Sequence, residues 1–145
     1  MKNYDLYKKM KDENIYYINH ELTFTRGAIA HYKGITAIVI DKKKVTSQTS
    51  ENTVIMQELG HYMANAYYKM NSSYELIEEM EQLADIKAWT EFFPYEKIKE
   101  LMDNGISTVT EIANYFDVEP FYMSRCLNYY YEHSNGFIDS TLNSN

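Results

Sequence analysis

The chain has 145 residues, of which 45% are hydrophobic and 24% charged, and its formal net charge is −7. This length and composition are typical of one globular domain with room for a small appended subdomain. The negative charge argues against a general binder of nucleic acid or of anionic membranes. The single cysteine, Cys126, excludes an intramolecular disulfide, residues 1–14 lack the apolar core of a signal peptide, and no apolar run is long enough for a membrane span. We therefore expect a cytoplasmic protein with no membrane partner.

The N-terminal third predicts a helix followed by strands. Residues 4–13 carry tyrosine and methionine at helical spacing and predict a short amphipathic helix. Residues 15–24 are rich in β-favouring side chains and predict a strand that Arg26-Gly27 ends. Residues 35–40 (Ile-Thr-Ala-Ile-Val-Ile) alternate little in polarity, so they predict a second strand that is buried on both faces.

A central helix from about Glu51 to Met70 organises the rest of the prediction. Residues 46–50 are rich in Ser and Thr, which favour helix starts, and Glu51 in the first turn suits the helix dipole. Gly60 inside this helix costs about 1 kcal/mol relative to Ala. Such a glycine indicates close packing, here against a strand or against the backbone of a substrate.

Four more helices are predicted after residue 72. They cover about residues 73–93, 94–103, 108–116 and 120–132. Capping boxes, Ser72 with Glu75 and Thr108 with Glu111, open the first and the third, and prolines open the second and the fourth. Residues 134–145 are polar and without periodicity, and predict a flexible tail.

The central helix contains the sequence Gln57-Glu58-Leu59-Gly60-His61. In the pattern H-E-x-x-H, two residues four apart on one helix face hold zinc, and the Glu beside the first of them is the general base. This stretch matches the pattern at Glu58 and His61 but has a carboxamide, Gln57, at the place of the first ligand. Because E-x-x-H alone arises often by chance, a metal site needs support from elsewhere in the chain.

The following helix offers a third ligand. One of its faces combines small and acidic residues: Glu81, Ala84, Asp85 and Ala88. Two antiparallel helices joined by a short turn would bring Glu81 opposite His61, and the alanines would let the helices approach closely. An acidic run such as residues 75–81 is by itself most often a solvated face. Beside Glu58 and His61, however, Glu81 becomes a candidate metal ligand.

These residues, in this order and spacing, resemble the ImmA/IrrE family of zinc metallopeptidases, especially the compact forms carried by phages and mobile elements of Gram-positive bacteria. The resemblance extends over about residues 15–131. The segments that carry it are Ile55–Tyr62, Glu81–Asp85, Phe93-Pro94, Thr110–Val118 and Leu127–Tyr130.

The resemblance implies an α+β fold in which a zincin-like core, residues 1–93, packs a motif helix pair on a short β-sheet. Residues 94–133 would then form a C-terminal subdomain similar to a helix-turn-helix. The resemblance also implies Glu58 as general base and His61 and Glu81 as zinc ligands. The expected function is that of a zinc-dependent endopeptidase acting on a bacterial or prophage transcriptional repressor, itself a helix-turn-helix protein.

Gln57 departs from the family pattern, because a neutral carboxamide is a poorer zinc donor than imidazole. Three interpretations remain open. Another residue completes the site: Asp85, one turn beyond Glu81, or His31 or His20. Alternatively, the metal is held weakly or is a harder ion that prefers oxygen ligands. In the third interpretation the site is inactive, and the fold serves as an anti-repressor that binds a regulatory protein without cleaving it.

Residues 108–131 resemble a helix-turn-helix in their two capped helices and three-residue turn. A DNA-binding helix-turn-helix, however, needs basic or amide side chains on its second helix and lysines or arginines around it that contact phosphates. From Pro94 onward the only lysines and arginines are Lys97, Lys99 and Arg125. We therefore expect these helices to pack against the core or dock a repressor rather than to bind nucleic acid directly.

We predict that this protein alone does not shift operator DNA in a gel, because phosphate neutralisation dominates such affinity and the C-terminal helices offer few cations. The measurement is a titration at two salt concentrations. Sub-micromolar, salt-sensitive binding would contradict the prediction.

Overall fold

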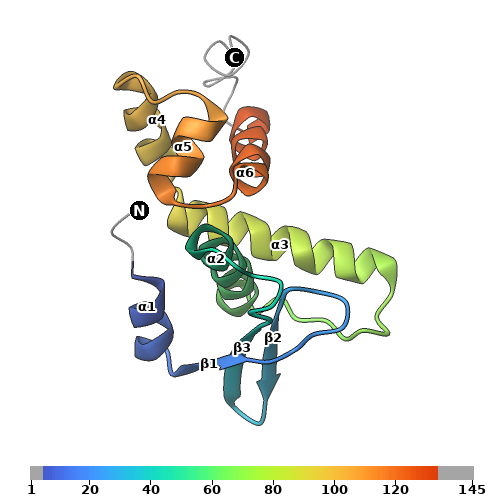
Figure 1. Ribbon diagram of the computed structural model, residues 1–145. Coiled ribbons are helices and arrows are strands. Elements are labelled where there is room, and N and C mark those ends of the chain that lie inside the picture. The colour runs from blue at the N-terminus through green and yellow to red at the C-terminus, as the bar shows by residue number, and fades with distance from the viewer. Residues whose placement is uncertain (1–4, 134–145) are drawn as a thin grey trace.

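The computed structural model describes residues 5–133 and shows an α+β fold of six helices and a three-stranded sheet over that range (Figure 1). The predicted tail, residues 134–145, lies outside the described residues. In chain order the elements are α1 (Leu6–Asp12), β1 (Ile15–Asn19), β2 (Gly27–Tyr32), β3 (Ile35–Ile40), α2 (Gln48–Ala64), α3 (Tyr74–Phe92), α4 (Tyr95–Asp103), α5 (Val109–Phe116) and α6 (Pro120–His133). None of the helices within residues 5–133 is both long and apolar enough to cross a membrane.

The sheet has the order β1-β3-β2, with β1 parallel and β2 antiparallel to β3. Strand β2 was not predicted, and β1 ends at Asn19 instead of continuing to residue 24. A two-residue turn joins β2 to β3, and both its residues, Lys33 and Gly34, have positive φ, as a tight hairpin turn requires. Glycine and two alanines give β2 a low intrinsic strand propensity, so pairing with β3 decides its conformation.

The prediction that β3 is buried on both faces was wrong. Its residues alternate, with Ile38 and Ile40 fully buried and Ile35 58% exposed. Helix α2 covers one face of the sheet (Figure 1). By the strand register the opposite face consists of apolar residues alone: Tyr16, Ile18, Ala28, Ala30, Tyr32, Ile35, Ala37 and Val39. Apart from Thr36, strand β3 is thus apolar on both faces although only one is covered, and this is why its sequence indicated double burial.

Helix α2 ends six residues earlier than predicted. Its C-cap, Asn65, adopts the left-handed conformation with φ of 51°, and the Ala66 N–H donates to the His61 carbonyl at 2.9 Å. Asparagine accepts this conformation at little cost, and the Ala66 bond closes the last turn. Residues 65–73 therefore form a loop, which returns the chain to the start of α3.

The caps of the later helices agree with the prediction at one place and differ at another. Ser73, not Ser72, caps α3 by accepting from the Leu76 N–H, and the Ser72 hydroxyl accepts instead from Lys69 in the loop. The capping box of Thr108 and Glu111 at the start of α5 is confirmed.

Close contact between α2 and α3 positions the rest of the fold. A Cβ on Gly60 would lie well within the van der Waals contact distance of the Ala84 carbonyl oxygen and 3.1 Å from the Ala88 Cβ. Ala84 and Ala88 are buried, so their small side chains allow the two backbones to approach. Gly60 is thus explained by helix packing rather than by contact with a strand.

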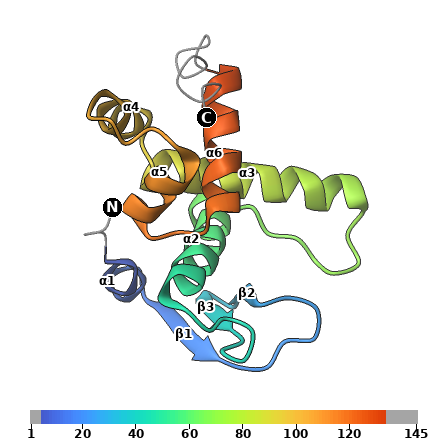
Figure 2. The same ribbon diagram turned by 45° about the horizontal axis from the view of Figure 1, so that its top comes forward.

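The C-terminal helices pack on the end of α3 through aromatic rings. Phe93 lies 4.8 Å from Phe116 and 5.9 Å from Tyr122, centroid to centroid. The Tyr130 hydroxyl donates to the Phe93 carbonyl at 2.6 Å. Figure 2 shows α6 standing across α3, so side chains of the two helices meet on the flank of α3.

We predict that Gly60→Ala lowers the free energy of unfolding by about 1–3 kcal/mol, because the added methyl group meets backbone atoms that cannot move independently. Urea denaturation measures the change. The matched control is Lys87→Ala on the exposed face of α3, which should stay within about 0.5 kcal/mol of the parent. An unchanged or increased stability of Gly60→Ala would contradict the described helix packing.

Candidate active site

The structure brings His61 of α2 and Glu81 of α3 together, as their spacing predicted. Their Nε2 and Oε2 atoms lie 2.9 Å apart. His61 follows Gly60 directly, and Glu81 stands three residues before Ala84 on the face of α3 that meets α2. The His61 side chain is 8% exposed and that of Glu81 45%, so the pair lies at the boundary between core and solvent.

The second ring nitrogen of His61 is also engaged. The Nδ1–H donates to the Ala66 carbonyl at 2.7 Å, which is possible because Asn65 turns the chain back at the end of α2. Burial disfavours the charged ring, but the hydrogen bonds to Glu81 and Ala66 and the charge of Glu58 outweigh it and raise the pKa of His61 to about 9. At neutral pH the ring therefore carries a proton on both nitrogens.

Glu81 has a further partner, Tyr68, in the loop after α2. The Tyr68 hydroxyl donates to Glu81 Oε2 at 2.6 Å, and its ring meets His61 edge-on at 5.9 Å. The hydrogen bond from His61, helped by that from Tyr68, lowers the pKa of Glu81 although partial burial opposes this. Sequence reasoning missed Ala66 and Tyr68 as site residues, since it extended the helix over them; Asn65, a residue tolerant of the left-handed C-cap conformation, was the available signal.

Glu58 completes the cluster from α2. It is half-buried and stands three residues before His61, on the same side of the helix. Burial raises the pKa of Glu58 to about 7; the charge of His61 lowers it, and the negative charges of Glu81 and Asp85 raise it further. A carboxyl group that titrates near neutral pH can exchange a proton in either direction, which is the property that a general base or acid needs.

The residues proposed to replace the missing first histidine lie in different surroundings. Gln57 is half-buried, one helical turn before His61 on the same face of α2. Asp85 is buried, and its carboxylate forms an ion pair with Arg125 of α6. Burial raises the pKa of Asp85, while the charge of Arg125 opposes that shift. Asp85 is therefore engaged with a cation rather than joined to the pair of His61 and Glu81.

The other candidate histidines have local partners. His20 hydrogen-bonds the Glu21 carbonyl at an exposed position, and His31 bonds the Thr36 hydroxyl and stacks on Tyr67 at 5.2 Å. Within residues 5–133 no three side chains of His, Cys, Asp or Glu form a group that could hold a metal ion.

Comparison of the chain with protein-family models, with curated proteins and with solved structures found no match. The chemistry of the site is therefore interpreted from its own geometry. That geometry is a proton-holding pair, His61 with Glu81, beside a carboxyl group of raised pKa, Glu58.

We predict that Glu81→Gln lowers the pKa of His61 in the metal-free protein, since the ring loses its anionic acceptor. A histidine with a raised folded-state pKa stabilises the fold fully below its unfolded pKa, about 6.5, and the stabilisation is lost as pH rises through about 9. NMR titration of the His61 ring with chelator present measures the shift. Glu79→Gln, on the exposed face of the same helix, is the control and should leave the titration unchanged. A His61 titration that is the same in Glu81→Gln and in the parent would contradict the described pair.

Proposed function

We propose that the chain is a zinc-dependent endopeptidase of the ImmA/IrrE type, with a zincin-like helix pair, that acts on a bacterial or prophage transcriptional repressor. The observation that carries the proposal is the position of His61 Nε2, 2.9 Å from Glu81, beside a Glu58 carboxyl group with a pKa of about 7. In the H-E-x-x-H pattern the motif helix supplies two metal donors and the general base; here His61 is one such donor, Glu58 stands at the position of the base, and Glu81 adds a donor from α3.

Two of the donors suit zinc. Ligands at zinc distances of about 2.0–2.2 Å in a tetrahedral sphere stand about 3.3–3.6 Å apart, so the two atoms of His61 and Glu81, now 2.9 Å apart, need to separate by less than about 1 Å to share an ion. The bond from His61 Nδ1 to the Ala66 carbonyl orients the ring and leaves Nε2 for the metal, as second-shell carbonyls do in zinc proteins. The third protein donor would be the carboxamide oxygen of Gln57. Such a set binds zinc more weakly than one with two histidines.

In the proposed reaction zinc supplies Lewis acidity, which polarises the scissile carbonyl and makes water easier to deprotonate. Glu58 takes the proton from the attacking water on its carboxylate oxygen and returns it to the nitrogen of the leaving amine. Tyr68 holds Glu81 through its hydroxyl, and Glu81 in turn holds His61. Because His61 is protonated at neutral pH, loading the site releases the Nε2 proton.

A second candidate function is binding of the repressor without cleavage. The observation that favours it is the ion pair between Asp85 and Arg125, because it engages the carboxylate that would otherwise replace the missing ligand. With Gln57 as the remaining donor, the metal sphere has one strong ligand fewer than the family pattern. In this alternative the pair of His61 and Glu81 is a structural ion pair at the junction of α2 and α3.

Metal content separates the two functions. For the enzyme, we predict close to one zinc per purified chain, loss of zinc in His61→Ala, and tighter zinc binding in Gln57→His, because imidazole replaces a weak donor. Mass spectrometry of the intact protein and competition with a chromogenic chelator measure these values. Metal-free protein whose zinc uptake appears only in Gln57→His would favour the binding module.

Cleavage supplies the second test. The candidate substrates are helix-turn-helix repressors of the source genome, each incubated with parent, Glu58→Gln and chelator-treated protein. We expect Glu58→Gln to bind the repressor as the parent does and to cleave at least about a hundredfold more slowly, the usual size of a general-base contribution. Cleavage by metal-free parent, unaffected by chelator, would overturn the zinc mechanism.

A further inference from the structure

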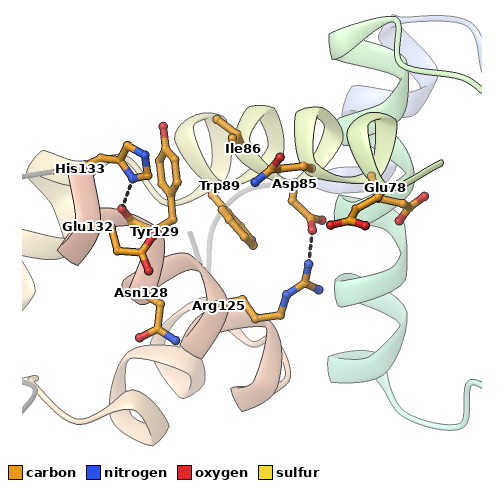
Figure 3. Close-up of a pocket in the computed structure, with 11 residues that line it drawn as sticks. Glu78, Asp85, Ile86, Trp89, Arg125, Asn128, Tyr129, Glu132 and His133 are labelled. Carbon is orange, nitrogen blue, oxygen red and sulfur yellow. Dashed lines mark hydrogen bonds and ion pairs between the residues drawn. The ribbon is translucent and has the colours of Figure 1, made fainter. Parts of the chain in front are cut away.

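A cavity of about 420 Å³ lies between α3 and α6, next to the candidate active site. Glu81 lines it and also bonds His61, so the cavity and the site share a wall. Figure 3 shows Asp85 and Trp89 extending from α3 toward Arg125 on α6. This volume lies at the lower end of the range of about 300–1,000 Å³ that ligand pockets have, so it can hold one large side chain.

The lining combines acidic groups with aromatic rings. Four carboxylates line it, Glu78, Glu81, Asp85 and Glu132, together with the rings of Trp89 and Tyr129. The only lysine or arginine in this lining is Arg125. A negative field beside aromatic faces favours an organic cation, because carboxylates neutralise its charge while the rings attract it through their quadrupole.

Arg125 shows how a cation sits in this cavity. Its guanidinium pairs with Asp85, and its carbon Cζ lies 5.7 Å from the centroid of the Trp89 ring. The Arg125 side chain is nevertheless half exposed, whereas that of Asp85 is 8% exposed. The anion is thus fixed in the wall, while the cation reaches it from the solvent side and can be exchanged. Because Asp85 is buried, its carboxylate needs a cation at all times, so Arg125 can leave it only when another cation takes its place.

Trp89 also carries a hydrogen-bond donor without an acceptor. The residue is 6% exposed, and its indole Nε1 has no hydrogen-bond partner among the residues described. A buried N–H without an acceptor is unusual in a folded protein. A carbonyl group of a bound peptide is an acceptor of the kind that this N–H lacks.

We propose that this cavity binds an arginine side chain of the protein partner, with the guanidinium taking the place of Arg125 on Asp85 and over Trp89. The inference rests on the proposed function in one respect: it takes from it that the partner is a protein chain bound at the site of Glu81. The cavity would add a determinant of substrate specificity, because it selects a substrate with an arginine near the peptide bond that is cleaved. Nucleic acid is a poor fit, because the four carboxylates of the lining repel its phosphates.

The test uses the natural reporter in the wall, because Trp89 is the only tryptophan of the chain. The probes are two capped pentapeptides, Ac-Ala-Ala-Arg-Ala-Ala-NH2 and the same peptide with citrulline, which keeps the shape of arginine but is neutral. They are titrated into metal-free Glu58→Gln protein, in which cleavage cannot occur, while tryptophan emission is recorded. We expect saturable binding of the arginine peptide about tenfold tighter than that of the citrulline peptide.

Two variants distinguish recognition from a structural effect. Glu132→Gln, at an exposed position of the rim, should weaken arginine binding severalfold and leave citrulline binding unchanged. Arg125→Gln should strengthen arginine binding, because it removes the internal competitor; a merely structural Arg125 would give weaker binding. Glu91→Gln, on the exposed side of α3 and outside the cavity lining, is the matched control, and circular dichroism melting confirms that each variant is folded.

Equal affinity for the two peptides, or no gain in Arg125→Gln, overturns the arginine site. The proposed enzyme is tested separately. If the chain binds the arginine peptide but neither holds zinc nor cleaves, the arginine site is supported and the peptidase function is rejected. If a repressor is cleaved at an unchanged rate after every arginine near the cut bond is replaced, the arginine site is rejected and the peptidase function stands.

Discussion

The contact of α2 with α3 at Gly60 sets the geometry on which the candidate site depends. Without a side chain at this position, the α2 backbone comes against the carbonyl of Ala84 and the methyl of Ala88. His61 and Glu81 project from the two helices next to this contact, so their separation of 2.9 Å follows from the approach of the backbones. Long side chains at the contact would move the helices apart, and the pair would lose its hydrogen bond.

This approach also concentrates negative charge. Glu58, Glu81 and Asp85 lie near one another in a partly dry environment, and two cations, His61 and Arg125, compensate them. Burial raises the pKa of Glu58 to about 7 and also raises that of Asp85 despite its ion pair with Arg125, whereas the hydrogen bond from His61 lowers the pKa of Glu81. The different proton affinities of the carboxylates therefore come from the balance of burial against hydrogen bonds and neighbouring charges.

The C-terminal helices contribute to this balance. Their aromatic packing on Phe93 places α6 against the flank of α3, and α6 carries Arg125 to Asp85. The α5–α6 pair has the outline of a helix-turn-helix, but its arginine pairs with a core carboxylate rather than facing outward as a phosphate contact. On this geometry its role is to form one wall of a cavity beside the candidate site.

Local chemistry of the sequence was enough to predict most helices and the central pair. Pro94, Pro120 and the capping box at Thr108 mark helix starts through interactions within one turn, and these starts are observed to within one residue. Spacing also placed Glu58 with His61 on one helix face and Glu81 with Asp85 on another, because residues three and four apart share a face, and the short connection between the two helices predicted that these faces meet.

Features that depend on distant partners needed the tertiary structure. Strand β2 exists because β3 pairs with it, and the outer face of β3 is open because no described element covers it. The end of α2 at Asn65 is selected by the loop that returns to α3 and carries Tyr68 to Glu81, since the sequence of residues 65–70 allows a helix equally well. Likewise, Asp85 shares a helix face with Glu81, but it forms its ion pair with Arg125, which is forty residues away in the chain. Sequence spacing fixes which side chains share a face within one helix; only the packing of separate elements decides which partner each of them meets.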